Sequence, residues 1–197
     1  MEHRVINLEK FQTREEGGKR FLDGYFSVFN QPYDVWPGWI EEIAPGAFSR
    51  TLREGKDVKV LWNHNTDIVL GSTENRTAHL SEDEHGLHGP VEINEEDQDA
   101  KNAFARVSRG DVRGCSFGFD IRGMEEWWDD DGTYHTRLTD VDLYEVSPCT
   151  FPAYTQTSIT ARNKDTLEAA KARYEEARNQ KINEWRESMK ARLKGEN

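Results

Sequence analysis

Hydrophobic and polar residues alternate with a period of two along much of this chain, which is the pattern of half-buried β-strands. The most regular example is the stretch GCSFGFDI at 114–121. One side of that strand carries Cys115, Phe117, Phe119 and Ile121, whereas Ser116 lies on the other side between two glycines. Because glycine has no side chain to shield its neighbours, we expect the serine hydroxyl to face a groove.

Other segments show the same alternation and are separated by turn signals rich in Gly, Pro, Asn and Asp. We expect strands at 21–29, 39–43, 57–64, 71–81, 86–93 and 134–146, with a last extended segment at 154–161. Helical spacing appears at 45–52 and 95–108. Many short strands with few helices predict a mainly β or α+β fold, a small antiparallel barrel or sandwich rather than a parallel sheet.

The C-terminal tail has a different pattern. Apolar residues recur there every three or four positions, slip once and then resume, at Leu167, Ala170, Tyr174, Ala177, Ile182, Trp185, Met189 and Leu193. This spacing predicts one long, charged helix over Lys164–Leu193 that needs a partner to bury its apolar stripe. The chain thus divides into a polar leader at 1–20, a body at 21–162 and a helical tail at 163–197.

Charge narrows the classes of partner. The chain has 37 acidic and 26 basic residues, and nine of the basic residues with seven of the acidic ones lie in the tail. The rest of the chain, residues 1–162, has 30 acidic and 17 basic residues, which argues against nucleic acid or an anionic membrane and suits a basic polypeptide. Two cysteines make no disulfide framework, and no stretch has the apolar character of a signal peptide or a membrane span. We expect a soluble cytoplasmic protein without cofactors.

Three residues form a candidate catalytic set. Ser116 is a poor nucleophile unless a base takes its proton, and histidine is the side chain that titrates near neutral pH. His64 follows an apolar strand and leads into a polar loop, which suits a fixed imidazole. The third member is a carboxylate that orients the imidazole. Glu145 is the candidate because it interrupts a hydrophobic strand, and Asp142, expected on the opposite face, is its rival.

Other constellations carry less weight. Residues 114–118 match the G-x-S-x-G nucleophile elbow, but a polar segment precedes this serine and strand-like alternation follows it, where an elbow needs a buried strand and a helix. His79, His85 and His88 flank an acidic turn without the spacing of a zinc site. Cys115 faces away from Ser116, where a buried thiol is inert.

Taken together, the motifs resemble those of tailed-phage prohead maturation proteases, a serine protease family similar in fold to herpesvirus assemblin. The resemblance covers roughly 21–162, and the order and spacing of its short motifs make it specific. It rests on GYFSVFN at 24–30, EIAPGAF at 42–48, VLWNHN at 60–65, LGS at 70–72, GCSFGF at 114–119, LYEVSP at 143–148 and PA at 152–153. It places the catalytic histidine on His64 and the serine on Ser116. In assemblin the third member is a second histidine, which has no counterpart here, and Glu145 stands in its neighbourhood.

The resemblance implies an assemblin-type barrel ringed by helices, with serine and histidine on adjacent strands facing a shallow groove. It also implies limited proteolysis inside assembling procapsids in the host bacterial cytoplasm. The substrates would be scaffold, the scaffold-like N-terminal region of the major capsid protein, and the protease itself. A homodimer or self-association through the C-terminal helix is a further expectation. The alternative is a catalytically inactive capsid-assembly module whose helix binds coat subunits, which would have no need of a reactive hydroxyl at Ser116.

Overall fold

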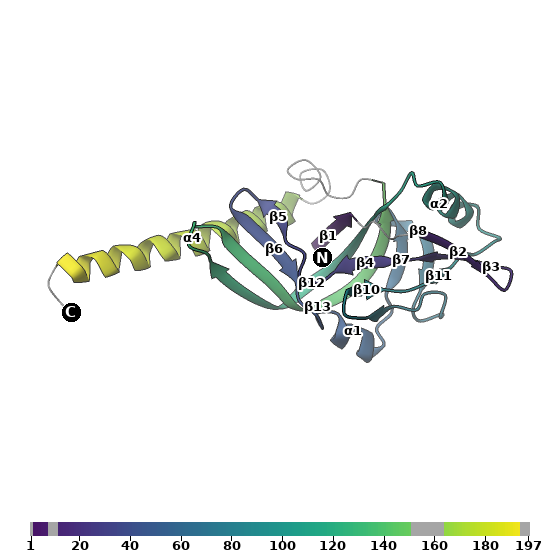
Figure 1. Cartoon of the computed structure of the whole chain (residues 1–197), viewed down its shortest axis with the longest axis horizontal. Coiled ribbons are helices and arrows are strands. Elements are labelled where there is room, and N and C mark those ends of the chain that lie inside the picture. The colour runs from purple at the N-terminus through teal and green to yellow at the C-terminus, as the bar shows by residue number, and fades with distance from the viewer. Residues whose placement is uncertain (1, 8–11, 151–163, 194–197) are drawn as a thin grey trace. The chain divides into compact units, whose positions relative to one another are not determined.

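The computed structural model describes residues 2–7, 12–150 and 164–193 (Figure 1). The chain comprises two compact units, 1–154 and 155–197. Within the described residues, the first holds the sheets and the helices α1 and α2, and the second holds one long helix. The expected extended segment at 154–161 lies outside the described residues. Each unit is described by itself.

A branched sheet dominates the first unit, and two long strands run through its middle. The hairpin of β12 (Gly114–Trp128) and β13 (Tyr134–Cys149) turns at 129–133, a stretch rich in Asp with one Gly. Around this hairpin lie β1 (Glu2–Asn7), β5 (Tyr33–Trp36), β6 (Trp39–Ile43), β7 (Lys59–Trp62) and β8 (Asn65–Ser72). The 114–121 stretch is therefore a central strand of the sheet.

Two smaller sheets complete the β structure. One contains β4 (Tyr25–Val28), β9 (Ser81–Glu82) and β10 (Gly86–His88), and the other contains β2 (Gln12–Glu16), β3 (Lys19–Asp23) and β11 (Val91–Glu92). The strand expected at 21–29 is divided at Gly24, whose positive φ of 157° turns the chain from one sheet into the other. The residues expected to form a polar leader also contribute β1 and β2.

The fold is mainly β, as predicted, but the expected antiparallel barrel is not observed. No sheet closes on itself within the described ranges, and β13 runs parallel to both β6 and β7. β6 pairs with the first half of β13, from Tyr134 to Leu138, whereas β7 pairs near its end, at Glu145 and Val146. One edge of β13 therefore pairs with two strands, and the part of β13 between these pairings has no strand partner on that side.

The short helix α1 (Ser49–Glu54) fills this stretch. The Thr51 hydroxyl donates to the Val141 carbonyl at 2.8 Å and accepts from the Leu143 N–H at 3.2 Å, while the Val141 N–H donates to the Ala47 carbonyl. Buried backbone groups need such partners. A fully buried threonine thus continues the hydrogen bonding of β13 where no strand follows.

The helix α2 (Gln98–Ser108) begins at Asp97, whose side chain accepts from the Asp99 N–H as an N-cap. It contacts β2, β3 and β8. Its buried residues are Ala100, Ala103 and Val107, and Phe104 packs partly buried beside them. They join a continuous core that also contains Phe117 and Phe119 from β12.

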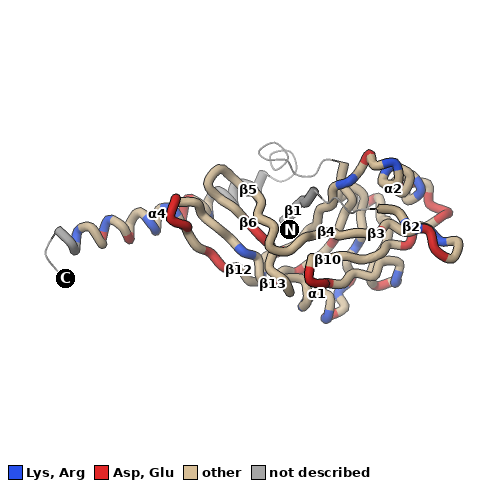
Figure 2. Tube along the Cα trace, in the orientation of Figure 1, with Lys and Arg blue, Asp and Glu red and all other residues tan. Residues whose placement is uncertain are grey.

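The second unit contains α4 (Lys164–Leu193), which has the bounds that the spacing of apolar residues predicts. Lys and Arg alternate with Asp and Glu along it (Figure 2). Trp185 is 63% exposed. None of the helices in the described ranges has the length and apolar character needed to cross a bilayer.

Candidate active site

The structure brings His64 and Glu145 into direct contact. His64 Nδ1 lies 2.6 Å from Glu145 Oε1, and both side chains are largely buried, 12% and 5% exposed. A carboxylate only accepts hydrogen bonds, so Nδ1 carries the ring proton and donates it to Glu145. The other ring nitrogen, Nε2, is then the unprotonated one, which is the tautomer that a general base requires.

His64 lies in a tight turn rather than on the strand predicted at 57–64. β7 ends at Trp62, β8 begins at Asn65, and these two residues pair, so Asn63 and His64 form a two-residue hairpin loop. Both have positive φ, 52° and 60°. This loop type requires positive φ at both positions, and asparagine and histidine adopt it more readily than most side chains. The turn directs the histidine toward β13.

The pairing of β12 with β13 places Ser116 beside this contact. Ser116 lies directly opposite Ser147, and Gly118 lies opposite Glu145. Residues opposite each other in an antiparallel pair share a face of the sheet, with Cβ atoms about 5 Å apart. Ser116 and Glu145 therefore project from the same face. Gly118 itself adds no side chain to that face opposite Glu145.

The open groove expected at Ser116 is not present. Ser116 is 0% exposed, although its two glycine neighbours have no side chains. The sequence pattern describes only one strand, whereas the exposure of a serine depends on everything packed above it.

Two further residues belong to the site and are absent from the predicted set. The fully buried Ser147 hydroxyl donates to Glu145 Oε2 at 2.6 Å and accepts from the His64 backbone N–H at 3.2 Å. Cys149 Sγ lies 3.6 Å from His64 Nε2. The sequence spacing could have predicted both, because Glu145, Ser147 and Cys149 are every second residue of one strand and so share a face.

Asp142, the rival acid, does not contact His64. The pairing skips Tyr144, with Glu145 opposite Gly118, Leu143 opposite Phe119 and Asp142 opposite Asp120. This β-bulge places Asp142 on the same face as Glu145, so the prediction of opposite faces is wrong. Strict alternation holds only where a strand has no extra residue.

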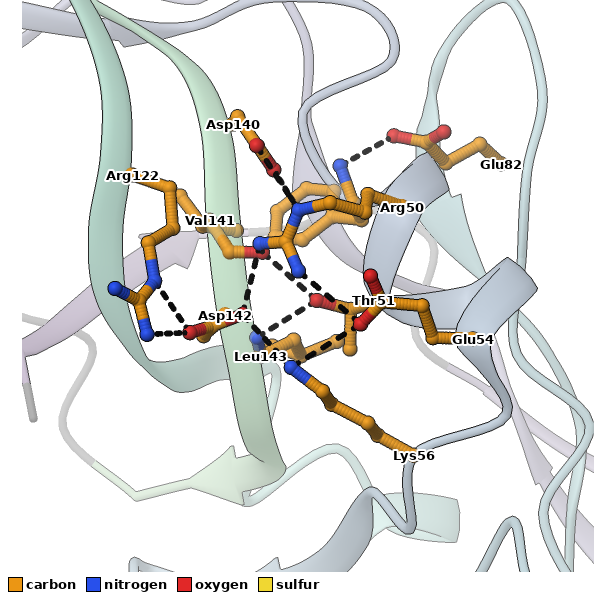
Figure 3. A network of polar contacts seen from close by, with 11 residues as sticks. Arg50, Thr51, Glu54, Lys56, Glu82, Arg122, Asp140, Val141, Asp142 and Leu143 are labelled. Carbon is orange, nitrogen blue, oxygen red and sulfur yellow. Dashed lines mark hydrogen bonds and ion pairs between the residues drawn. The ribbon is translucent and has the colours of Figure 1, made fainter.

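Asp142 instead lies in a cluster of ion pairs between α1 and the two long strands (Figure 3). Arg50 Nη2 and Lys56 Nζ lie 2.8 and 3.1 Å from its Oδ1, and Arg122 Nε lies 2.5 Å from its Oδ2. Hydrogen bonding to Arg50, followed by that to Arg122 and Lys56, holds the pKa of Asp142 well below its ordinary value. A carboxylate engaged by three cations is suited to fastening α1 to the sheet rather than to orienting an imidazole.

The remaining candidates lie away from this contact. Cys115 packs in the core with Phe117 and Phe119, and burial raises the pKa of its thiol well above the ordinary value. A thiol that resists ionisation is a poor nucleophile. The rings of His85 and His88 pack against Tyr25. In the part of the chain that the structure describes, no three His, Cys, Asp or Glu residues are grouped as a metal site.

Comparison with known proteins identifies the family. The pattern of the family described as "Caudovirus prohead serine protease" matches residues 9–172. The chain is also 30% identical over 148 residues to the "Prohead protease" of Enterobacteria phage HK97, which covers 74% of this chain and 61% of that protein. The chain thus corresponds to less than two thirds of that relative. No solved structure matches. The chain belongs to the caudovirus prohead serine protease family.

Proposed function

We propose that this chain is a serine endopeptidase of capsid maturation, with Ser116 as nucleophile, His64 as general base and Glu145 as the acid that orients the imidazole. The observation that carries the proposal is the 2.6 Å contact between His64 Nδ1 and Glu145 Oε1, on the sheet face that also bears Ser116. Family membership supports the reaction class.

In the proposed reaction, His64 Nε2 takes the proton of the Ser116 hydroxyl as Oγ attacks the carbonyl carbon of the scissile peptide bond. The C–N bond breaks as the imidazolium returns that proton to the leaving amine, and an acyl-enzyme ester remains. A water molecule, deprotonated by the same nitrogen, then hydrolyses the ester. Glu145 keeps the second proton on Nδ1 throughout and stabilises the charged imidazolium between the two transfers.

We infer that the substrates are scaffold polypeptides, the N-terminal region of the major capsid protein, and the protease itself, inside assembling procapsids in the host cytoplasm. The acidic body favours basic segments of these chains. The tail 163–197, with its exposed Trp185, is the proposed site both of self-association and of self-cleavage.

The full burial of Ser116 favours a second candidate function, an inactive capsid-assembly module. The two functions differ in whether any bond is cut. The test compares intact masses of the wild type and Ser116→Ala after incubation at assembly concentration. We expect the wild type to lose residues after Arg162 and Ser116→Ala to stay whole.

Cys149→Ala is the matched control, because its thiol lies near the same imidazole nitrogen. A wild type that stays whole and leaves an unfolded casein substrate uncut would support the assembly module. Cleavage by Ser116→Ala that is lost in Cys149→Ala would move the nucleophile to Cys149. Equal loss of the tail in every variant would indicate a contaminating protease.

A further inference from the structure

The Ser147 hydroxyl lies between the two elements that make the proposed base, the turn that carries His64 and the strand that carries Glu145. It donates its single proton to Glu145 Oε2 at 2.6 Å. Its oxygen accepts from the His64 N–H at 3.2 Å. Ser147 is 0% exposed, so water does not substitute for either partner. This one hydroxyl therefore links the backbone of the base to the carboxylate that binds its ring.

The turn needs such a link because its backbone is unfavourable. A left-handed backbone conformation is unfavourable for a residue other than glycine, and Asn63 and His64 both adopt it. Two hydrogen bonds to Thr150 hold the Asn63 side chain. Asn63 Nδ2 donates to Thr150 Oγ1 at 3.2 Å, and the Thr150 backbone N–H donates to Asn63 Oδ1 at 2.9 Å. The Asn63 backbone N–H donates to the Pro148 carbonyl at 3.1 Å. These bonds attach the turn to the end of β13, beyond Glu145.

The carboxylate needs the link for a different reason. Glu145 has three rotatable side-chain bonds, and only one orientation presents Oε1 to the imidazole. With Oε2 bound to Ser147 on the same strand, Oε1 points at His64 Nδ1. A donor bound to one oxygen thus restricts the side-chain torsions of Glu145 and keeps the other oxygen at the imidazole.

We propose that Ser147 is a positioning residue of the protease, which holds the Glu145 carboxylate and the His64 backbone in register so that Nδ1 keeps its proton and its bond to Glu145. This inference rests on the proposed function for its catalytic meaning. Its structural content, the alignment of the His64 ring with Glu145, stands without any activity.

The kinetic test is Ser147→Ala. We expect kcat to fall about 10- to 100-fold with KM unchanged, because a small misplacement of a base slows chemistry without altering substrate contacts. Ser72→Ala is the matched control. Ser72 is also a buried serine whose hydroxyl donates to a carboxylate, that of Asp57, but it lies at the end of β8 that is farther from the His64 turn. We expect its kcat to stay within about twofold of wild type.

A spectroscopic test separates this proposal from the proposed function. In Ser116→Ala protein, the His64 Nδ1 proton should give a far-downfield NMR resonance, protected by its bond to Glu145. We expect the added Ser147→Ala change to broaden or abolish this resonance through exchange with water, whereas Ser72→Ala keeps it. An unchanged resonance in Ser147→Ala would overturn the positioning role, even for an active protease.

A second pair of variants decides the question if Ser147→Ala does not fold. Ser147→Thr and Ser147→Val have nearly the same shape and differ in the hydroxyl. The proposal requires that the threonine variant keep the His64 Nδ1 resonance where the valine variant loses it, or that it fold more stably than the valine variant. Equal behaviour of the two, folded or unfolded, would contradict it. Loss of proteolysis plays no part in this outcome, so an inactive protein tests the proposal equally well.

Discussion

Glu145 and Asp142 are buried carboxylates on one face of one strand, yet their surroundings differ. Asp142 meets Arg50, Lys56 and Arg122, whereas Glu145 meets an imidazole and a hydroxyl. Three cations neutralise the first acid and anchor a helix. The second meets the ring and the backbone-linked hydroxyl that suit the proposed orientation of His64. The difference teaches that the role of a buried acid follows from its partners rather than from its position along a strand.

The largest expected effect comes from removing the proposed nucleophile or the proposed base. We predict that Ser116→Ala and His64→Ala each reduce proteolysis at least about 1,000-fold, and that the double variant is little worse, since nucleophile and base act as a unit. Rates of cleavage of unfolded casein measure this, with circular dichroism as the check on folding. If the rate of the double variant fell by the product of the two single reductions, the two residues would act separately.

Exchanging the charge of each acid tests the comparison directly. We predict that Glu145→Gln lowers kcat about 100-fold or more, because an amide no longer holds the Nδ1 proton or stabilises the imidazolium. Asp142→Asn should lower kcat less than about threefold, since its partners lie away from His64. An active Glu145→Gln beside a crippled Asp142→Asn would reverse the two assignments.

We expect the opposite order for folding stability, with Asp142→Asn losing more than Glu145→Gln. Asp142→Asn removes the charge that three cations share, and we predict a loss of about 2 kcal/mol, roughly 4–8 °C in Tm for a chain of this length. Glu145→Gln should cost less than about 1 kcal/mol, because the amide can still accept from Ser147. Calorimetry on both variants in the Ser116→Ala background, which prevents self-digestion, gives these values.

The smallest expected effect is the dependence of folding stability on pH. The pKa of Asp142 is lower in the folded chain than its ordinary value of 3.8, so its ion pairs stabilise the fold above that pH and are lost as pH falls below it. We predict that the stability gap between the parent protein and Asp142→Asn is full at pH 7 and narrows below about pH 4. Chemical unfolding at several pH values tests this. A gap that widens in acid would mean that the cluster does not depend on the Asp142 charge.

Much of the local structure follows from pattern alone. The strand at Trp39–Ile43 and the helix at Lys164–Leu193 have the predicted bounds, because their periodicity and flanking residues depend on the nearest neighbours in the chain. The return strand is different. We expect it to end at Val146 before Pro148, but β13 continues through that proline to Cys149. Pairing with β12 over its whole length outweighs a local breaker.

The amino-acid sequence by itself determined the family, the mainly β class and the residue types of the candidate site, since these depend on composition, period and motif spacing. Only the tertiary structure decided that His64 occupies a strained turn, that a bulge places both acids on one face, and that Ser147 and Cys149 join the site. It also decided that Ser116 is covered. These features arise from register and packing between segments far apart in the chain, which no local pattern encodes.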